Sequence, residues 1–201
     1  PNFQQKVKDF ITHFKIKIEE YDELLTGNII FQNRMKGVGY ISKEDAVSYG
    51  CSGPTARGSG VSCDIRKLYP YEVYANLQFD EILETGGDCF ARYMVRMKEM
   101  RQSLSIIEQM IDNIPEGDFQ AKTKAVLKLP KGEFYTRVET ARGELGVYIV
   151  SEGGTTPYRI KFRSPGFSNL SALDHMARGS KLGDLVAMMG TLDLVIPDID
   201  R

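Results

Sequence analysis

The 201-residue sequence has no tryptophan, only three cysteines and two histidines, and a net charge of just −1 at pH 7. Cys51, Cys63 and Cys89 lie too far apart for a Cys-x-x-Cys metal site, and their odd number favours reduced thiols in a cytoplasmic compartment. The 26 basic and 27 acidic residues are mixed, without the basic stripe typical of nucleic-acid-binding proteins. No apolar run approaches the roughly 20 residues that cross a bilayer. The sequence therefore argues against a local metal site, nucleic-acid binding and a transmembrane segment.

Two stretches repeat apolar residues every three or four positions, which predicts long helices with one apolar face. The first should end near Gly27, which suits the position just after a helix. The second should run from about Asp88 to Ile114, where Pro115 stops it. The apolar positions are Phe3, Val7, Phe10, Phe14, Ile18, Tyr21 and Leu25 in the first helix, and Tyr93, Met97, Met100, Leu104, Ile107 and Ile111 in the second. We expect these two helices to pack against each other.

The second helix also carries a line of polar side chains, which are Asp88, Arg92, Arg96, Glu99 and Ser103. Asp88 with Arg92 and Arg96 with Glu99 have the spacing of favourable pairs on a helix. This line is either a solvated face or a face that meets the glycine-rich loop or a partner subunit. Spacing alone leaves both interpretations open.

After a lysine-rich connector, residues 118–132, the apolar period changes from about 3.6 to two. Residues 145–150 and 158–163 are expected to be strands of a hairpin, and residues 133–139 a candidate third strand. Ser168 is a candidate N-cap for a terminal pair of helices that Gly179 interrupts. The sequence thus predicts an α+β fold, mainly a helical bundle with a small antiparallel β-hairpin module. The predicted parts of this single domain are a helical region at 1–117 with a glycine-rich loop at 50–74, the connector at 118–132, the β-hairpin module at 133–167, and C-terminal helices and tail at 168–201.

The glycine-rich loop is the most distinctive segment. Glycine and proline are so frequent at its start that we expect neither an ordinary helix nor a strand there. Arg57, Asp64 and Arg66 lie within it, and the planar guanidinium group of arginine pairs well with carboxylates. Spacing alone favours a structural loop with internal ion pairs.

Several motifs occur in a fixed order along the chain. They include Gly53-Pro54-x-x-Arg57-Gly58-Ser59-Gly60, Asp64-x-Arg66-Lys67, Gly87-Asp88-Cys89-Phe90-Ala91-Arg92-Tyr93, Arg96-x-x-Glu99-Met100-x-Gln102-Ser103, Gly143-Glu144-x-Gly146-Val147-Tyr148 and Gly190-Thr191-x-Asp193-x-Val195. Together they resemble the 49-kDa-type subunit of respiratory complex I (NADH-quinone oxidoreductase), over roughly residues 18–201. The resemblance covers the C-terminal half of such a subunit, so we expect an excised domain whose N-terminal half is missing.

That family is similar to the large subunit of nickel–iron hydrogenases, which implies a fold like that subunit. In hydrogenases, two Cys-x-x-Cys pairs supply the soft thiolate ligands of the metal centre. The matching C-terminal stretch here is Asp193-Leu194-Val195-Ile196-Pro197-Asp198, which puts Val195 and Asp198 at the two cysteine positions. The resemblance therefore implies no metal and no hydrogenase activity.

In complex I, as the resemblance implies, the cavity vacated by the metal centre receives the quinone headgroup. Asp193 and Val195 are accordingly the candidate quinone-binding residues: the carboxylate would hold a hydrogen-bond partner in place, and the valine would offer apolar surface. A carboxylate that merely caps a helix or turn is the alternative for Asp193. The chain is expected to supply no catalytic residue of its own.

A second set of candidates would form a buried ion-pair network that fixes loops near the cavity. Its members are Arg57, Asp64, Arg66, Asp88, Arg92 and Glu139. Glu139 begins the stretch Glu139-Thr-Ala-Arg142-Gly143, which resembles a motif of both families with Ala141 in place of the expected proline. Such a network would hold the structure together without performing chemistry.

The resemblance implies a component of a proton-translocating NADH:quinone oxidoreductase, on the cytoplasmic side of the inner (cell) membrane in the peripheral arm. Its partners would be other complex I subunits, above all the small iron–sulfur subunit and the missing N-terminal half, and it would meet the membrane only through the complex. No cofactor is expected on this chain; quinone is the substrate of the assembled complex, and NAD and the iron–sulfur clusters belong to partner subunits. The alternatives are a non-catalytic scaffold in that complex, or a part of a related complex that uses another electron donor.

Overall fold

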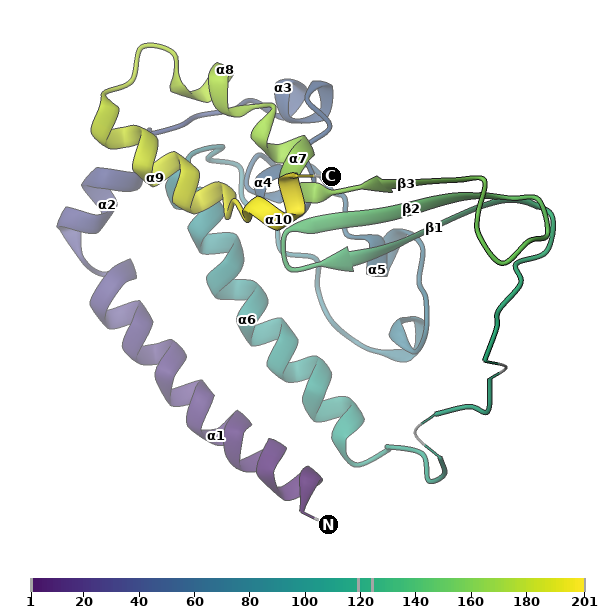
Figure 1. The fold of residues 1–201 in the computed structure, drawn as a ribbon. Helices are drawn as coiled ribbons and strands as arrows, with labels where there is room; N and C mark the ends of the chain where they lie inside the picture. Colours follow the sequence, from purple (N-terminus) through teal and green to yellow (C-terminus); the bar gives the residue numbers. More distant parts are fainter. Residues whose placement is uncertain (1, 119, 124, 201) are drawn as a thin grey trace.

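The computed structural model describes residues 2–118, 120–123 and 125–200. About half of this chain is helical, and three strands form one antiparallel sheet, so the predicted α+β class is confirmed. Figure 1 shows the sheet projecting sideways from the helices. The elements are α1 (Phe3–Tyr21), the π-helical turn η1 (Asp22–Thr26), α2 (Ile29–Met35), α3 (Lys43–Ser48), α4 (Gly53–Arg57), α5 (Ile65–Leu68), the 3-10 turn η2 (Tyr74–Asn76), α6 (Cys89–Ile111), β1 (Gly132–Thr140), β2 (Gly143–Ser151), β3 (Arg159–Arg163), α7 (Pro165–Leu170), α8 (Leu173–Ala177), α9 (Leu182–Leu192) and α10 (Ile196–Ile199).

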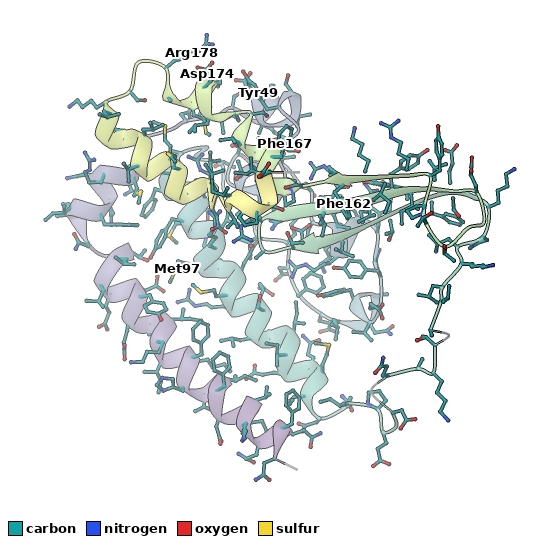
Figure 2. The ribbon with its side chains drawn as sticks, viewed as in Figure 1. Tyr49, Met97, Phe162, Phe167, Asp174 and Arg178 are labelled. Carbon is teal, nitrogen blue, oxygen red and sulfur yellow. The ribbon has the colours of Figure 1, made fainter. Side chains whose placement is uncertain are left out.

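The two long helices, α1 and α6, lie side by side (Figure 1). Ile11 and Ile18 of α1 form a buried cluster with Met97 and Leu104 of α6. Met97 lies on the side of α6 that faces α1 (Figure 2). The predicted packing of the two apolar faces is therefore confirmed. The main contribution to the packing of α1 on α6 is the burial of apolar surface, which stabilises by about 25 cal/mol for each Å² removed from water.

The helix ends differ in detail from the prediction. After Tyr21 the first helix widens into the π-helical turn, which ends at Gly27. This glycine has φ −76 and not the left-handed conformation that is common for glycine just after a helix. A short helix not anticipated from the sequence, α2, then begins after Asn28, whose side chain accepts a hydrogen bond from the Ile30 amide at 2.9 Å. Helix α6 ends at Ile111, a turn before Pro115.

A second buried cluster joins segments from both ends of the chain. Its members are Ile41, Ala46, Cys51, Ala56, Cys89, Ala172, Met176, Met188 and Leu192. It packs α3, α4 and the start of α6 against α8 and α9. This core holds the glycine-rich loop in place from several sides.

The expectation of no ordinary helix at the start of the glycine-rich loop was wrong, because α4 is a short helix there; α5 follows it within the same loop. Pro54 lies in the first turn of α4, where a helix tolerates proline because the first amides have no intrahelical partner. Asp64 is the N-cap of α5, and its side chain accepts a hydrogen bond from the Arg66 amide at 2.9 Å. The segment is thus a pair of short helical turns.

The sheet has the order β1-β2-β3, and both neighbouring pairs are antiparallel. Thr140 pairs with Gly143, so Ala141 and Arg142 form a two-residue turn between β1 and β2. The predicted hairpin of β2 and β3 and the candidate third strand, β1, are all present.

After the sheet, the cap was predicted four residues too late. Ser164 is the N-cap of α7 and accepts a hydrogen bond from the Phe167 amide at 3.4 Å, whereas Ser168 lies inside that helix. Pro165 in the first turn explains the earlier start. Gly179 separates α8 from α9 with φ 76, as its position in the sequence suggested.

Across the described residues, none of the helices is both long enough and apolar enough to cross a membrane.

Candidate functional site

The site is built around Arg57, at the end of α4, which is only 1% exposed. Its Nε donates to Glu99 Oε1 of α6 at 2.7 Å, and its Nη1 donates to Glu139 Oε1 of β1 at 2.8 Å. One buried guanidinium group therefore joins the glycine-rich loop, the long helix and the sheet. Glu99 is engaged by Arg57, so the pair that spacing predicted between Arg96 and Glu99 is not among the ion pairs of the described residues.

A second ion pair lies beside the first. Arg66 Nη2 donates to Asp64 Oδ2 at 2.6 Å, and Arg66 Nε donates to Asp64 Oδ1 at 2.9 Å, which is the bidentate geometry that arginine favours with carboxylates. The Glu139 carboxylate also accepts a hydrogen bond from the Ile65 amide at 3.2 Å, at the start of α5. The structure thus brings four predicted candidates together, and α5 is held against β1.

Burial and charge act in opposite directions on the pKa values of these groups. Burial lowers the pKa of Arg57, but the charges of Glu99 and Glu139 outweigh it, so the pKa is raised and the group stays charged. Burial likewise works to raise the pKa of Asp64, yet Arg66 holds that pKa below its usual value. For Glu139 the burial effect prevails over Arg57, and its pKa is raised. Glu139 therefore binds a proton more readily than a solvent-exposed glutamate does.

Asp88 and Arg92 were predicted in the same network, but they do not form an ion pair with each other in the part of the chain that the structure describes. Asp88 caps α6, accepting from the Ala91 amide at 2.8 Å and from the Gly37 amide at 2.7 Å. Arg92 is fully buried and donates to the backbone oxygens of Gly39 at 3.0 Å and Gly87 at 3.1 Å. Asp88 is drawn away because a helix start offers unpaired amides to a carboxylate.

Asp193 directly follows α9, in the left-handed conformation with φ 56. Its Oδ2 lies 3.2 Å from Nε of Arg142, which also donates to the Asp193 backbone oxygen at 3.0 Å. Arg142 occupies the tight turn between β1 and β2, so this pair ties the sheet to the end of α9. Arg142 was not among the predicted site residues, although its place in the Glu139-to-Gly143 motif was the signal that could have identified it.

Several of these groups line one open cavity of about 530 Å³ between α1, α6 and the β1–β2 turn. One end is charged, with Arg57, Arg66, Arg96, Glu99, Glu139 and Asp193. The other end is apolar, with Phe10, Phe14, Met100, Leu104 and Ile107. Such a mixture of apolar wall and few polar groups is typical of a small-molecule site. Val195 is half-buried before α10 and is not among the described residues that line this cavity.

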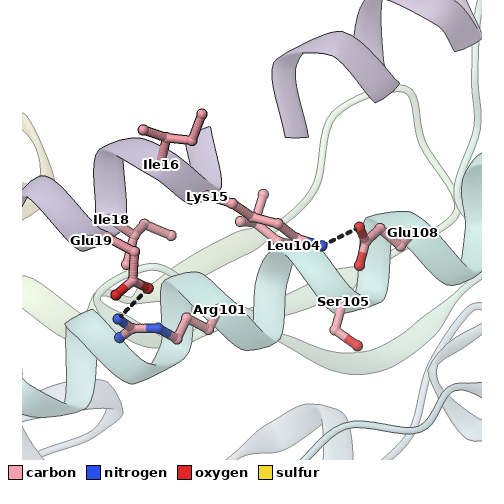
Figure 3. Close-up of a pocket in the computed structure, with 8 residues that line it drawn as sticks. All are labelled: Lys15, Ile16, Ile18, Glu19, Arg101, Leu104, Ser105 and Glu108. Atoms are coloured by element: carbon pink, nitrogen blue, oxygen red, sulfur yellow. Dashed lines mark hydrogen bonds and ion pairs between the residues drawn. The ribbon is translucent and has the colours of Figure 1, made fainter. Parts of the chain in front are cut away.

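Another cavity, of about 500 Å³, lies along α1 and α6 (Figure 3). It is bordered by ion pairs of exposed side chains, Lys15 with Glu108 at 2.6 Å and Arg101 with Glu19 at 3.1 Å. Exposed pairs of this kind contribute little to stability, about 0–1 kcal/mol. The cavity that contains Asp193 is lined instead by the buried ion pairs of Arg57, and we take it as the candidate site.

The described residues contain no group of three or more histidine, cysteine or acidic side chains arranged to hold a metal ion. Cys51, Cys63 and Cys89 are free thiols, and burial raises the pKa of Cys51 and of Cys63 to about 11. Asp198 Oδ2 accepts a hydrogen bond from the Gly166 amide at 2.8 Å.

The sequence profile described as "Respiratory-chain NADH dehydrogenase, 49 Kd subunit" matches residues 1–128 and 123–201. The chain is 54% identical over 201 residues to an NADH-quinone oxidoreductase subunit of Bacteroides fragilis, covering 100% of the chain and 38% of that protein. It is 45% identical over 198 residues to an NADH-quinone oxidoreductase subunit of Desulforamulus reducens, covering 98% of the chain and 54% of that protein.

A solved structure of the membrane-bound sulfane sulfur reductase, an archaeal respiratory membrane complex, contains a similar chain. The match has a TM-score of 0.93 and 35% identity, and covers 100% of this chain and 56% of the other. These similar proteins are all parts of redox enzymes. The chain belongs to the family of the 49-kDa subunit of respiratory-chain NADH dehydrogenase. It spans about half or less of the length of these relatives.

Proposed function

We propose that this chain is the part of a proton-translocating NADH:quinone oxidoreductase that helps to form the quinone-reduction cavity, next to the small subunit with the terminal iron–sulfur cluster. The observation that carries the proposal is the position of Asp193. In a chain of the 49-kDa family, this carboxylate lies in a mixed charged and apolar cavity, next to a buried ion-pair network. A quinone headgroup needs the same combination of polar contacts and apolar wall.

In this proposal the fold is that of the nickel–iron hydrogenase large subunit, with Val195 and Asp198 in place of metal-binding cysteines. The chain holds no cofactor; NAD and the iron–sulfur clusters are in partner subunits, and electrons reach the cavity from the neighbouring small subunit. Within the assembly the chain lies in the peripheral arm, on the cytoplasmic side of the membrane. Arg57, Asp64, Arg66 and Glu139 act as the frame that fixes the cavity wall.

The role of the Asp193 carboxylate is to hold Arg142, and through it the β1–β2 turn, at the cavity edge. Val195 contributes apolar surface two residues further on, where the wall is completed by the neighbouring small subunit. If Asp193 only ended α9, its carboxylate would be dispensable, because asparagine also tolerates the left-handed conformation.

The test is Asp193→Asn in the fully assembled complex. Asparagine keeps the backbone and the size but loses the charge-assisted contact to Arg142, so quinone reductase activity should fall about tenfold. NADH oxidation by an artificial acceptor, which takes electrons upstream, should change little. Asp174→Asn is the matched control, since the exposed side chain of Asp174 pairs with exposed Arg178 at the end of α8, away from the cavity (Figure 2).

Val195→Met should change the affinity for quinone or for inhibitors through lost volume, without abolishing turnover. Unchanged quinone kinetics in both variants would remove these residues from the site and favour the alternative of a non-catalytic scaffold.

A second candidate function is a role in a related complex with a different electron donor. The similarity to a chain of a sulfane sulfur reductase complex, at a TM-score of 0.93, favours it. Purification of the assembled complex would separate the two: a nucleotide- and flavin-binding subunit supports NADH as donor, and its absence supports the related complex.

A further inference from the structure

Arg96 differs from every other charged group of the cavity. Arg57 contacts two carboxylates, Arg66 contacts Asp64, and Asp193 contacts Arg142. Arg96 lines the same cavity and is half-buried, yet no carboxylate lies within ion-pair distance of it in the described ranges.

The hydrogen-bonding capacity of Arg96 is also largely unused. A guanidinium group has five N–H donors. In the described chain, the side chain makes one hydrogen bond, from Nη1 to the backbone oxygen of Arg92 at 3.1 Å. Burial lowers the pKa of Arg96, and the charge of Asp193 offsets this only in part. Keeping Arg96 charged at this position therefore costs free energy, which a bound anion would recover.

The surroundings indicate what kind of anion fits. Beyond Arg96 the cavity wall is aromatic and aliphatic, with Phe10 and Phe14 of α1 and Met100 and Leu104 of α6. A carboxylate presents two oxygens to the guanidinium fork, and an attached hydrocarbon chain would cover the apolar wall. The volume of about 530 Å³ falls within the usual range of small-molecule sites, about 300–1,000 Å³.

We propose that this cavity is a binding site for an amphiphilic monocarboxylate, with the carboxylate on Arg96 and the hydrocarbon chain against the apolar faces of α1 and α6. The site goes beyond the proposed function, since binding at Arg96 does not require quinone chemistry. An occupant would block the charged end of the cavity.

The test uses sodium dodecanoate as the probe, below its micelle concentration, in calorimetric titration of the purified 201-residue chain. We expect saturable binding of dodecanoate, and binding at least about tenfold weaker for dodecyltrimethylammonium, which has a similar hydrocarbon tail and the opposite charge. Arg96→Gln should weaken dodecanoate binding about tenfold or more. Arg101→Gln, which removes an exposed arginine paired with Glu19 and Asp22 outside this cavity, is the matched control and should stay within about twofold.

Methyl NMR of the wild-type chain locates the ligand even if Arg96→Gln does not fold. The Met100 methyl group should shift on adding dodecanoate, whereas Met110, in a separate apolar groove at the far end of α6, should not. Equal binding by Arg96→Gln, equal binding of the cationic amphiphile, or a shift confined to Met110 would each overturn the proposal. A parallel titration with decylubiquinone keeps the two proposals apart: Arg96-dependent binding of the quinone without dodecanoate binding overturns this inference and leaves the quinone role standing.

Discussion

At the scale of single residues, Arg57 is the charge on which most of the site depends. It is 1% exposed and contacts carboxylates from two other elements. Such a group is costly to bury alone, and its two partners are equally costly to leave without it. Arg57 therefore stabilises the fold only while both of its carboxylate partners are present.

Replacing Arg57 by glutamine should destabilise the chain by about 3–5 kcal/mol, because Glu99 and Glu139 would remain buried without their cation. Urea unfolding followed by circular dichroism measures this change. Arg101→Gln removes an arginine from exposed pairs with Glu19 and Asp22, and should cost about 0–1 kcal/mol. Similar losses for both variants would show that the Arg57 cluster is no stronger than a surface ion pair.

At the scale of elements, the decisive contact is the approach of α4 to the β1–β2 turn. Gly53 has φ +62, and a Cβ atom placed on it would lie 2.4 Å from the Arg142 backbone oxygen. A Cβ atom on Gly143 would lie 2.7 Å from the Gly53 amide nitrogen. Two glycines thus let the backbones of loop and sheet touch, which brings Arg57 within reach of Glu139.

Gly53→Ala should therefore destabilise the chain by about 1–3 kcal/mol more than Gly37→Ala. Gly37 has a similar φ of +70 but nothing within 4 Å of an added Cβ atom, so it reports the cost of backbone strain alone. Thermal or urea unfolding of the two variants gives the difference. Equal destabilisation would mean that α4 can retreat from the turn at no cost.

At the scale of the whole molecule, the chain leaves the helices after α6 and returns as the sheet (Figure 1). The described residues between Ile111 and Gly132 contain no helix or strand and are largely exposed. Nevertheless the two parts are joined elsewhere, by Arg57 with Glu139 and by the packing of α9 on α6. The two parts are therefore held together both by the connector and by noncovalent contacts.

Limited trypsin digestion should first cut within this connector, where Lys122, Lys128 and Lys131 are exposed outside regular structure. The two fragments should remain together in gel filtration under native conditions and separate in urea. Early cleavage within α1 or α6, or fragments that separate without denaturant, would contradict this description.

The sequence by itself determined the pattern of elements and the family. Apolar residues every three or four positions fixed the pairing of α1 with α6, and the change to a period of two fixed the sheet, because both periods are local properties of the chain. The order of motifs also identified candidate site residues, namely Arg57, Asp64, Arg66, Glu139 and Asp193. Helix ends were less well defined, since Gly27, Pro54 and Ser164 each have several conformations open to them until neighbours are present.

Only the tertiary structure decided which charges meet. Arg57 finds its partners 42 and 82 residues away, and Arg142 reaches Asp193 across 51 residues. Spacing on one helix suggested Asp88 with Arg92 and Arg96 with Glu99, but a free helix end and a buried arginine on another segment compete more strongly for those carboxylates. The reason is physical: a period depends on neighbours in sequence, whereas a buried charge is placed by whichever opposite charge the fold brings within reach.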